Sequence, residues 1–251
     1  SRSIDLLPAY FAELRLTLAT RGGLDADAER GARSQPGGRA VCLVDLRACV
    51  RAGLRAEERM WHEVGTNAHR GYIFLAGLAL LAASPVPRGL AAYRARIAEL
   101  AADVLAAPRD GVAFTHGERL RRLHGLAGIH GEALRGLPAV FEHGRRALRR
   151  GWEAGWDRSA AAHYAMAVLM QNLEDSTAVH RCGLEGLRRL REDGRRIQAA
   201  LESGDDHRRL LSVLNDEYRA MRLTMGGVAD CLALSLAVEG SGIWLPDGEP
   251  V

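Results

Sequence analysis

Apolar residues recur three or four positions apart through most of this chain, and that spacing restricts the fold more than any other feature of the sequence. The pattern covers residues 41–62, 67–83, 89–107, 116–125, 139–150, 158–173, 178–202, 206–222 and 228–238. A period near 3.6 residues is typical of helices with one buried face, and the alternation expected of strands is hard to find. Pro85, Pro87 and Pro108 separate successive segments. The sequence therefore predicts an all-α protein, a compact single-domain bundle of about nine to ten helices.

Composition agrees with this prediction, because alanine, leucine and arginine dominate and all three favour helices. The 251 residues, 47% of them hydrophobic, are enough for one sizeable core. Residues 4–20 have helical spacing interrupted at Pro8, whereas residues 21–40 are rich in glycine, charge and small side chains. We expect residues 1–40 to form a variable N-terminal helix and a surface loop, and residues 41–251 to form the all-helical functional domain.

The charge argues against nucleic acid as a partner. The net charge is only +3, and the arginines are spread along the helices without a basic tail interleaved with aromatic residues. All 34 basic residues are arginine, so arginine must supply the cationic contacts to any phosphate and lysine-dependent chemistry is excluded.

The cysteines and the longest apolar run indicate a cytoplasmic protein without a membrane anchor. The four cysteines show no CxxC spacing, which favours buried, reduced thiols over a zinc ribbon or a redox pair. The longest apolar run, residues 72–86, is shorter than the roughly 18 to 20 residues that cross a bilayer, and no signal sequence opens the chain. We interpret this run as a core helix.

Polar residues gather where glycine interrupts the helical pattern, first at residues 63–74. Thr66 or Asn67 can cap the next helix, and His69 and Arg70 fall in its first turn. Cations repel the positive end of a helix, so these side chains either point into solvent or hold an anion between them.

A second interruption, at residues 124–138, places Gly125, Gly128 and Gly131 three positions apart. Repeated glycines indicate close approach of the backbone, either to a ligand or to a neighbouring helix. Glu132 heads the apolar segment that follows, where a carboxylate is expensive unless it has a partner.

Two more interruptions carry aspartates. Asp175 precedes Ser176 and Thr177, and it is either a helix cap or a ligand of Mg²⁺. Gly226 and Gly227 open the last helix ahead of Asp230. Such a junction holds a phosphate or simply joins two helices.

These four interruptions, in this order, resemble the signatures of the triphosphoribosyl-dephospho-CoA synthase family, whose enzymes make the prosthetic-group precursor of citrate lyase and malonate decarboxylase. Residues 65–74 (GTNAHRGYIF) resemble the family's GGVNTHKGAIF, and residues 124–138 (HGLAGIHGEALRGLP) resemble its YGIRGARGEAASGFP. Residues 175–183 (DSTAVHRCG) match DTNLLHRGG, and residues 224–235 (TMGGVADCLALS) match SPGGSADLLALT. A shorter AExxM element matches residues 56–60.

The chain also departs from the family pattern. Arg70 replaces a lysine, Ala127 and His130 stand where arginines are usual, and Thr177 replaces an asparagine. The family's first motif, a proline- and glycine-containing segment, has no counterpart in residues 1–40. These positions are expected to touch substrate, so the departures indicate either a changed acceptor or reduced activity.

The resemblance implies a transferase that moves the 5-triphosphoribosyl group of ATP onto the ribose hydroxyl of 3′-dephospho-CoA and releases adenine. Mg²⁺ is the expected cofactor, ATP and dephospho-CoA or another small acceptor are the expected partners, and a homodimer is a further expectation. The implied catalytic residues are Glu132, Asp175 and His180, with Glu132 as the first choice for the general base or ribose-positioning group. The implied phosphate-binding residues are Asn67, His69, Arg70, His130, Arg181, Gly226 and Gly227. Asp175 and Asp230 are the implied magnesium ligands.

Two alternatives stay open on sequence grounds. A diverged relative would displace adenine, or another base, onto a different acceptor. A non-catalytic nucleotide-binding protein would use the same helical scaffold without turnover.

Overall fold

Every regular element that the structure describes is a helix, as the sequence predicts. The computed structural model describes residues 2–28, 43–66, 69–84, 87, 89–106 and 125–241. The helices are α1 (Arg2–Asp5), α2 (Leu7–Ala28), α3 (Leu43–Val64), α4 (Arg70–Ala82), α5 (Leu90–Ala106), α7 (Gly128–Leu134), the π-helix η1 (Ala139–Gly144), α8 (Arg145–Glu153), α9 (Arg158–Asn172), α10 (Ser176–Ser203), α11 (His207–Met221) and α12 (Gly226–Ser241). The predicted helix at 116–125 and residues 242–251 lie outside the described residues, apart from the non-helical residue 125.

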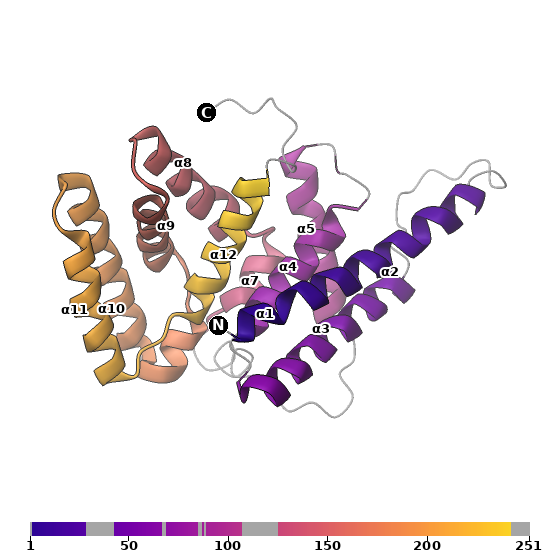
Figure 1. Cartoon of the computed structure of the whole chain (residues 1–251), viewed down its shortest axis with the longest axis horizontal. Helices are drawn as coiled ribbons and strands as arrows, with labels where there is room; N and C mark the ends of the chain where they lie inside the picture. The colour runs from indigo at the N-terminus through magenta and orange to yellow at the C-terminus, as the bar shows by residue number, and fades with distance from the viewer. Residues whose placement is uncertain are drawn as a thin grey trace.

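Helices α2 and α3 run antiparallel, side by side, and project from one side of the molecule (Figure 1). Pro8 lies in the first turn of α2, where the missing N–H has no intrahelical partner to lose. The helix continues to Ala28, so the predicted loop at residues 21–28 was wrong. Extending a helix is easier than starting one, and two glycines at about 1 kcal/mol each do not end it alone. Residues 29–40, and with them the predicted boundary at residue 40, lie outside the described residues.

The apolar run that begins at Tyr72 forms α4, which lies in the middle of the protein with one continuous core around it. Ile73, Leu75 and Leu78 are almost completely buried, which confirms the prediction of a core helix. The same core includes side chains from α2 through α12. Among the described residues, no helix is long and apolar enough to cross a membrane.

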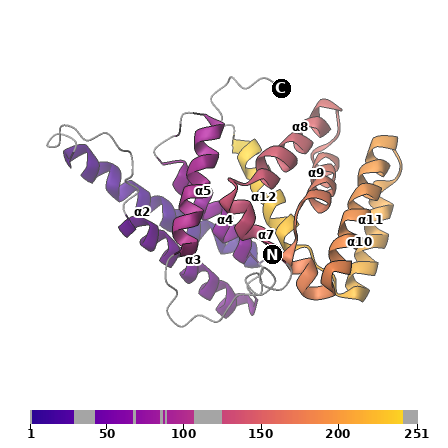
Figure 2. The ribbon, with the colours of Figure 1, turned by 180° about the vertical axis from the view of Figure 1, so that it is seen from behind.

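Helices α9, α10 and α11 lie side by side on the side of the molecule opposite α2 and α3, and α12 runs between the two groups (Figures 1 and 2). Helix α10 bends at Gly183, whose positive φ of 67° departs from helical geometry. Helix α7 was not predicted, because glycines at residues 125–131 suggested a break, whereas Gly131 lies inside a short helix. The arrangement brings the first turns of α4, α7, α10 and α12 to one region, where the four sequence motifs lie.

Candidate functional site

The first turns of α4, α10 and α12 meet through glycines that leave room for aspartate side chains. A Cβ on Gly71 of α4 would stand 2.0 Å from Oδ2 of Asp230 on α12. A Cβ on Gly227 of α12 would stand 3.2 Å from Oδ2 of Asp175, the residue that caps α10. Both glycines are therefore needed for close approach between the backbone of one helix and a carboxylate held by another.

A second pair of contacts adds α7 to this region. A Cβ on Gly226 would lie 2.8 Å from Oγ1 of Thr177, and one on Gly128 would lie 3.3 Å from Oγ of Ser176. The helix N-termini that meet here each carry partial positive charge and N–H groups without intrahelical acceptors. Such a cluster of helix starts favours negative groups, whether side chains or phosphates.

Asp175 ties two of these helices together. Its Oδ1 accepts hydrogen bonds from the backbone N–H of Thr177 (2.9 Å) and Ala178 (3.0 Å), which caps α10, and its Oδ2 accepts one from Val228 N–H of α12 (2.9 Å). The residue is 1% exposed. Burial raises the pKa of the Asp175 carboxyl, while the backbone donors act in the opposite direction. Asp175 is thus a helix cap, one of the two roles that the sequence left open.

Asp230 is a second buried carboxylate of this region whose pKa is raised. It is 9% exposed and accepts a hydrogen bond from the backbone N–H of Tyr72. Burial, helped by the negative charge of Asp175 and opposed by the Tyr72 N–H, raises the pKa of Asp230 from 3.8 to about 7. Near neutral pH this carboxyl can both accept and release a proton.

Glu132 is buried, and both of its oxygens have hydrogen-bond donors. Oε2 accepts from the backbone N–H of Ala139 at the start of η1 (2.8 Å), and Oε1 accepts from Arg135 (2.7 Å). Between these partners Gly136 and Leu137 both have positive φ, so Glu132 holds a tight turn in place. The buried carboxylate is therefore stabilised by two hydrogen-bond donors, which its apolar surroundings make necessary.

Cys231 lies where the three carboxylates come together, and sequence reasoning missed it. The thiol is completely buried. Burial raises the pKa of Cys231 well above its usual value, and the charges of Glu132, Asp230 and Asp175 add to the effect. Three motifs far apart in the chain thus place their carboxylates around one thiol, which the position of Cys231 next to Asp230 could have suggested.

The basic residues of the first motif have protein partners. His69 Nε2 lies 3.1 Å from Ser3 Oγ, and Arg70 Nε lies 3.3 Å from Glu57 Oε2. Glu57 belongs to the AExxM element, so this contact links that element to the first motif. Asn67 lies outside the described residues.

The remaining basic residues lie at other places around the helix starts. The His130 ring packs edge-on against Phe74, with ring centroids 5.3 Å apart. His180 and Arg181 are exposed in the N-terminal part of α10. Glu174, which sequence reasoning also missed, accepts a hydrogen bond from the backbone N–H of Ala127 (3.0 Å) and so fixes the loop before α7.

The donor set does not fit a resident magnesium site with two aspartate ligands. Asp175 already accepts three backbone hydrogen bonds through its two oxygens, which leaves Asp230 as the available carboxylate. Within the described ranges, no group of three or more His, Cys, Asp or Glu side chains is placed to hold a metal ion. A hard cation held mainly by substrate phosphates and water stays compatible with one carboxylate.

Comparison with known proteins agrees with the four motifs. The profile of the family described as ATP:dephospho-CoA triphosphoribosyl transferase matches residues 17–245. The chain belongs to this family. The resemblance found in the sequence is therefore confirmed over most of the chain, and the matched region contains all four motifs.

Curated relatives carry the corresponding name. A protein of Azotobacter vinelandii named probable 2-(5′′-triphosphoribosyl)-3′-dephosphocoenzyme-A synthase is 36% identical over 196 residues, which cover 75% of this chain and 66% of the relative. A protein of Stutzerimonas stutzeri with the same name is 37% identical over 183 residues, 70% of this chain and 61% of the relative. The matched region thus spans slightly less than two thirds of these relatives. No solved structure matches the chain.

Proposed function

We propose that this protein transfers the 5-triphosphoribosyl group of ATP to the ribose hydroxyl of 3′-dephospho-CoA and releases adenine. Family membership and the names of the relatives support the reaction class. The observation that carries the proposal is the buried carboxyl of Asp230, with a pKa of about 7, in the region where the starts of α4, α7, α10 and α12 approach one another. A cytoplasmic location, a homodimer and the division at residue 40 remain predictions.

The reaction is a glycosyl transfer at C1′ of the ATP ribose. The bond from C1′ to the adenine nitrogen breaks, and its electron pair leaves with adenine, which takes up a proton. A bond forms between C1′ and the acceptor hydroxyl oxygen, whose proton passes to a base. The transition state resembles an oxocarbenium ion, so the site must supply a base, a proton for the leaving group and a cradle for the triphosphate.

Asp230 is the best candidate for the base. A general base works best when its pKa lies near the operating pH, and the buried position of Asp230 provides this. Glu132, the first choice on sequence grounds, is better suited to positioning, because both of its oxygens already accept hydrogen bonds. Asp175 holds α10 and α12 at the distance that the site requires.

The helix starts and nearby cations form the proposed triphosphate cradle. The N–H groups at Gly226 and Gly227 open α12, and a helix N-terminus binds phosphate through its backbone donors and its dipole. His180 and Arg181 are exposed in the first two turns of α10 and can reach an anion outside the helix starts. His180 is also the candidate proton donor to adenine.

Mg²⁺ remains a prediction, and in this proposal it arrives with ATP. Its ligands would be phosphate oxygens and water, and Asp230 would be the available carboxylate, because Asp175 already accepts three backbone hydrogen bonds. None of the steps assigned to protein residues depends on the ion.

The direct test is incubation of the protein with ATP, Mg²⁺ and 3′-dephospho-CoA, with adenine measured by chromatography. Adenine release that requires dephospho-CoA supports the proposal. Release only with another acceptor would support the diverged relative, which the Ala127 and His130 departures favour. Tight ATP binding without adenine release under any acceptor would support a non-catalytic nucleotide-binding protein.

A further inference from the structure

Helix α10 carries a groove outside the region of the helix starts. Its volume is about 440 Å³. The lining residues are Leu184, Leu187, Arg188, Arg191, Glu192 and Arg195. They follow one another at intervals of one, three or four residues, so they share one face of the helix beyond the bend at Gly183.

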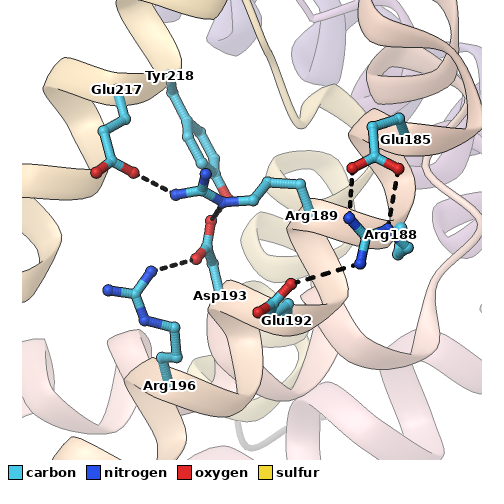
Figure 3. A network of polar contacts seen from close by, with 8 residues as sticks. All are labelled: Glu185, Arg188, Arg189, Glu192, Asp193, Arg196, Glu217 and Tyr218. Atoms are coloured by element: carbon cyan, nitrogen blue, oxygen red, sulfur yellow. Dashed lines mark hydrogen bonds and ion pairs between the residues drawn. The ribbon is translucent and has the colours of Figure 1, made fainter.

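The arginines of this helix differ in how their charge is neutralised. Arg188 lies between Glu185 and Glu192, as Figure 3 shows, with its closest oxygen 2.5 Å away on Glu185. Arg189 lies on another face of the helix, where it pairs with Asp193 and with Glu217 of α11 (Figure 3). Of these pairs, the one between Arg189 and Glu217 joins α10 to α11, and together they neutralise both arginines.

Arg191 and Arg195 are different. Neither has an ion pair with any residue that the structure describes, and the Nε atom of Arg191 is shielded from solvent without a hydrogen-bond acceptor. A buried donor without an acceptor is unfavourable, so an anion that accepts from Arg191 Nε would stabilise this position. Two guanidinium groups one turn apart suit the oxygens of a diphosphate, which arginine binds in a bidentate manner.

The groove also has an apolar side that leads toward the helix starts. Leu184 is 54% exposed, whereas Leu187 is buried in a small cluster with Val179 of α10 and Leu126 of the loop before α7. Val179 follows Ala178, whose N–H is capped by Asp175. The groove therefore lies next to the candidate site and presents both an unpaired cationic side and an apolar side.

We propose that this groove binds the acceptor, with the diphosphate on Arg191 and Arg195 and the pantetheine arm along Leu184. The inference rests on the proposed function, because it assigns the groove to 3′-dephospho-CoA and leaves the helix starts to the triphosphate of ATP. ATP has no long flexible arm to cover Leu184, so the combination of charge and exposed apolar surface favours the acceptor over the donor.

The test is calorimetric titration of the full chain with 3′-dephospho-CoA, ADP and ATP separately. Arg191→Gln combined with Arg195→Gln should weaken binding of dephospho-CoA at least tenfold and change binding of ATP less than about twofold. Leu184→Ser should weaken binding of dephospho-CoA but not of ADP, which has the diphosphate without the arm. Arg51→Gln, at an exposed arginine of α3, is the matched control and should change none of these affinities.

The outcomes separate this inference from the proposed function. Equal losses for ATP and dephospho-CoA, unchanged affinities in the double variant, or a wild-type protein that does not bind dephospho-CoA would each overturn the groove assignment. Adenine release by the wild-type protein is a separate readout. A protein that binds dephospho-CoA through Arg191 and Arg195 without releasing adenine would contradict the function and leave the groove assignment standing.

Discussion

The carboxylate of Asp230 lies directly against the backbone of Gly71, so that a methyl group on this glycine would stand 2.0 Å from Oδ2. The contact joins the N-terminal part of α12 to the first turn of α4, and hence the fourth sequence motif to the first. It also keeps Asp230 out of water, which is the main cause of its raised pKa.

Replacing Gly71 with alanine should therefore displace Asp230. We expect the free energy of unfolding to fall by about 1–3 kcal/mol, as in other overpacked interiors, and adenine release to fall more than tenfold. Gly53→Ala is the matched control, because a Cβ there would meet only ordinary contacts, 3.6 Å from Ile73 and 4.0 Å from Tyr10. Thermal unfolding and the adenine assay measure both effects. Full activity in Gly71→Ala would contradict the role assigned to this contact.

The stability of the wild-type protein should depend on the titration of Asp230. The pKa is about 7 in the folded state and 3.8 in the unfolded reference, so between these values the folded state binds more protons and stability falls as pH rises. The difference corresponds to roughly 4 kcal/mol. Urea unfolding at pH 4 and pH 8 should show this loss in the wild type and a much smaller one in Asp230→Asn. If the free energy of unfolding depends on pH in the same way in both proteins, the pKa of Asp230 is not raised by folding.

The pH dependence of catalysis should also follow the ionisation of Asp230. If Asp230 is the base, kcat/KM should rise with pH through about 7 as the carboxyl ionises, and Asp230→Asn should lose a factor of about 10² or more. ATP affinity measured with and without Mg²⁺ distinguishes a base from a ligand. If Asp230→Asn loses only the magnesium-dependent part of ATP binding, Asp230 is a magnesium ligand, as predicted from the sequence.

Asp175 should contribute more to folding than an ordinary cap. Asp175→Ala removes three buried hydrogen bonds, and we expect it to destabilise the protein by about 2–4 kcal/mol. Asp157→Ala is the matched control, because Asp157 also caps a helix, α9, by accepting from the Ala160 N–H, but is largely exposed. Its loss should cost much less than the loss of Asp175. Equal shifts of the denaturant midpoint in Asp175→Ala and Asp157→Ala would show that the hydrogen bond from α12 to Asp175 adds nothing to stability.

Replacing Glu132 with glutamine should have little effect on folding and activity. Glu132→Gln keeps an oxygen for the Ala139 N–H, so the turn before η1 should form and kcat should stay within about tenfold of the wild type. Glu132→Ala should lower the unfolding temperature, since it leaves that buried N–H without an acceptor. If Glu132→Gln lowers kcat as much as Asp230→Asn does, at unchanged stability, Glu132 is the base.

The sequence alone determined the class of fold and the family. Helical periodicity is a local property, so residues 72–82 could be identified as part of a core helix, and the four motifs could be recognised from short stretches of sequence. The same reasoning failed at residues 21–28 and 128–134, where glycines suggested breaks but helices form. At those places packing and helix extension outweigh residue preference.

Only the tertiary structure decided what the polar residues do. Whether a carboxylate is a cap, a turn anchor or a titrating group depends on which backbone donors face it and how much water reaches it. Asp175 meets Val228, Glu132 meets Ala139, and Asp230 meets Gly71 and Tyr72, and all of these contacts except the one of Glu132 join segments far apart in the chain. Periodicity along one helix contains no information about the start of another, so the raised pKa of Asp230 and the unpaired arginines of the α10 groove follow from packing alone.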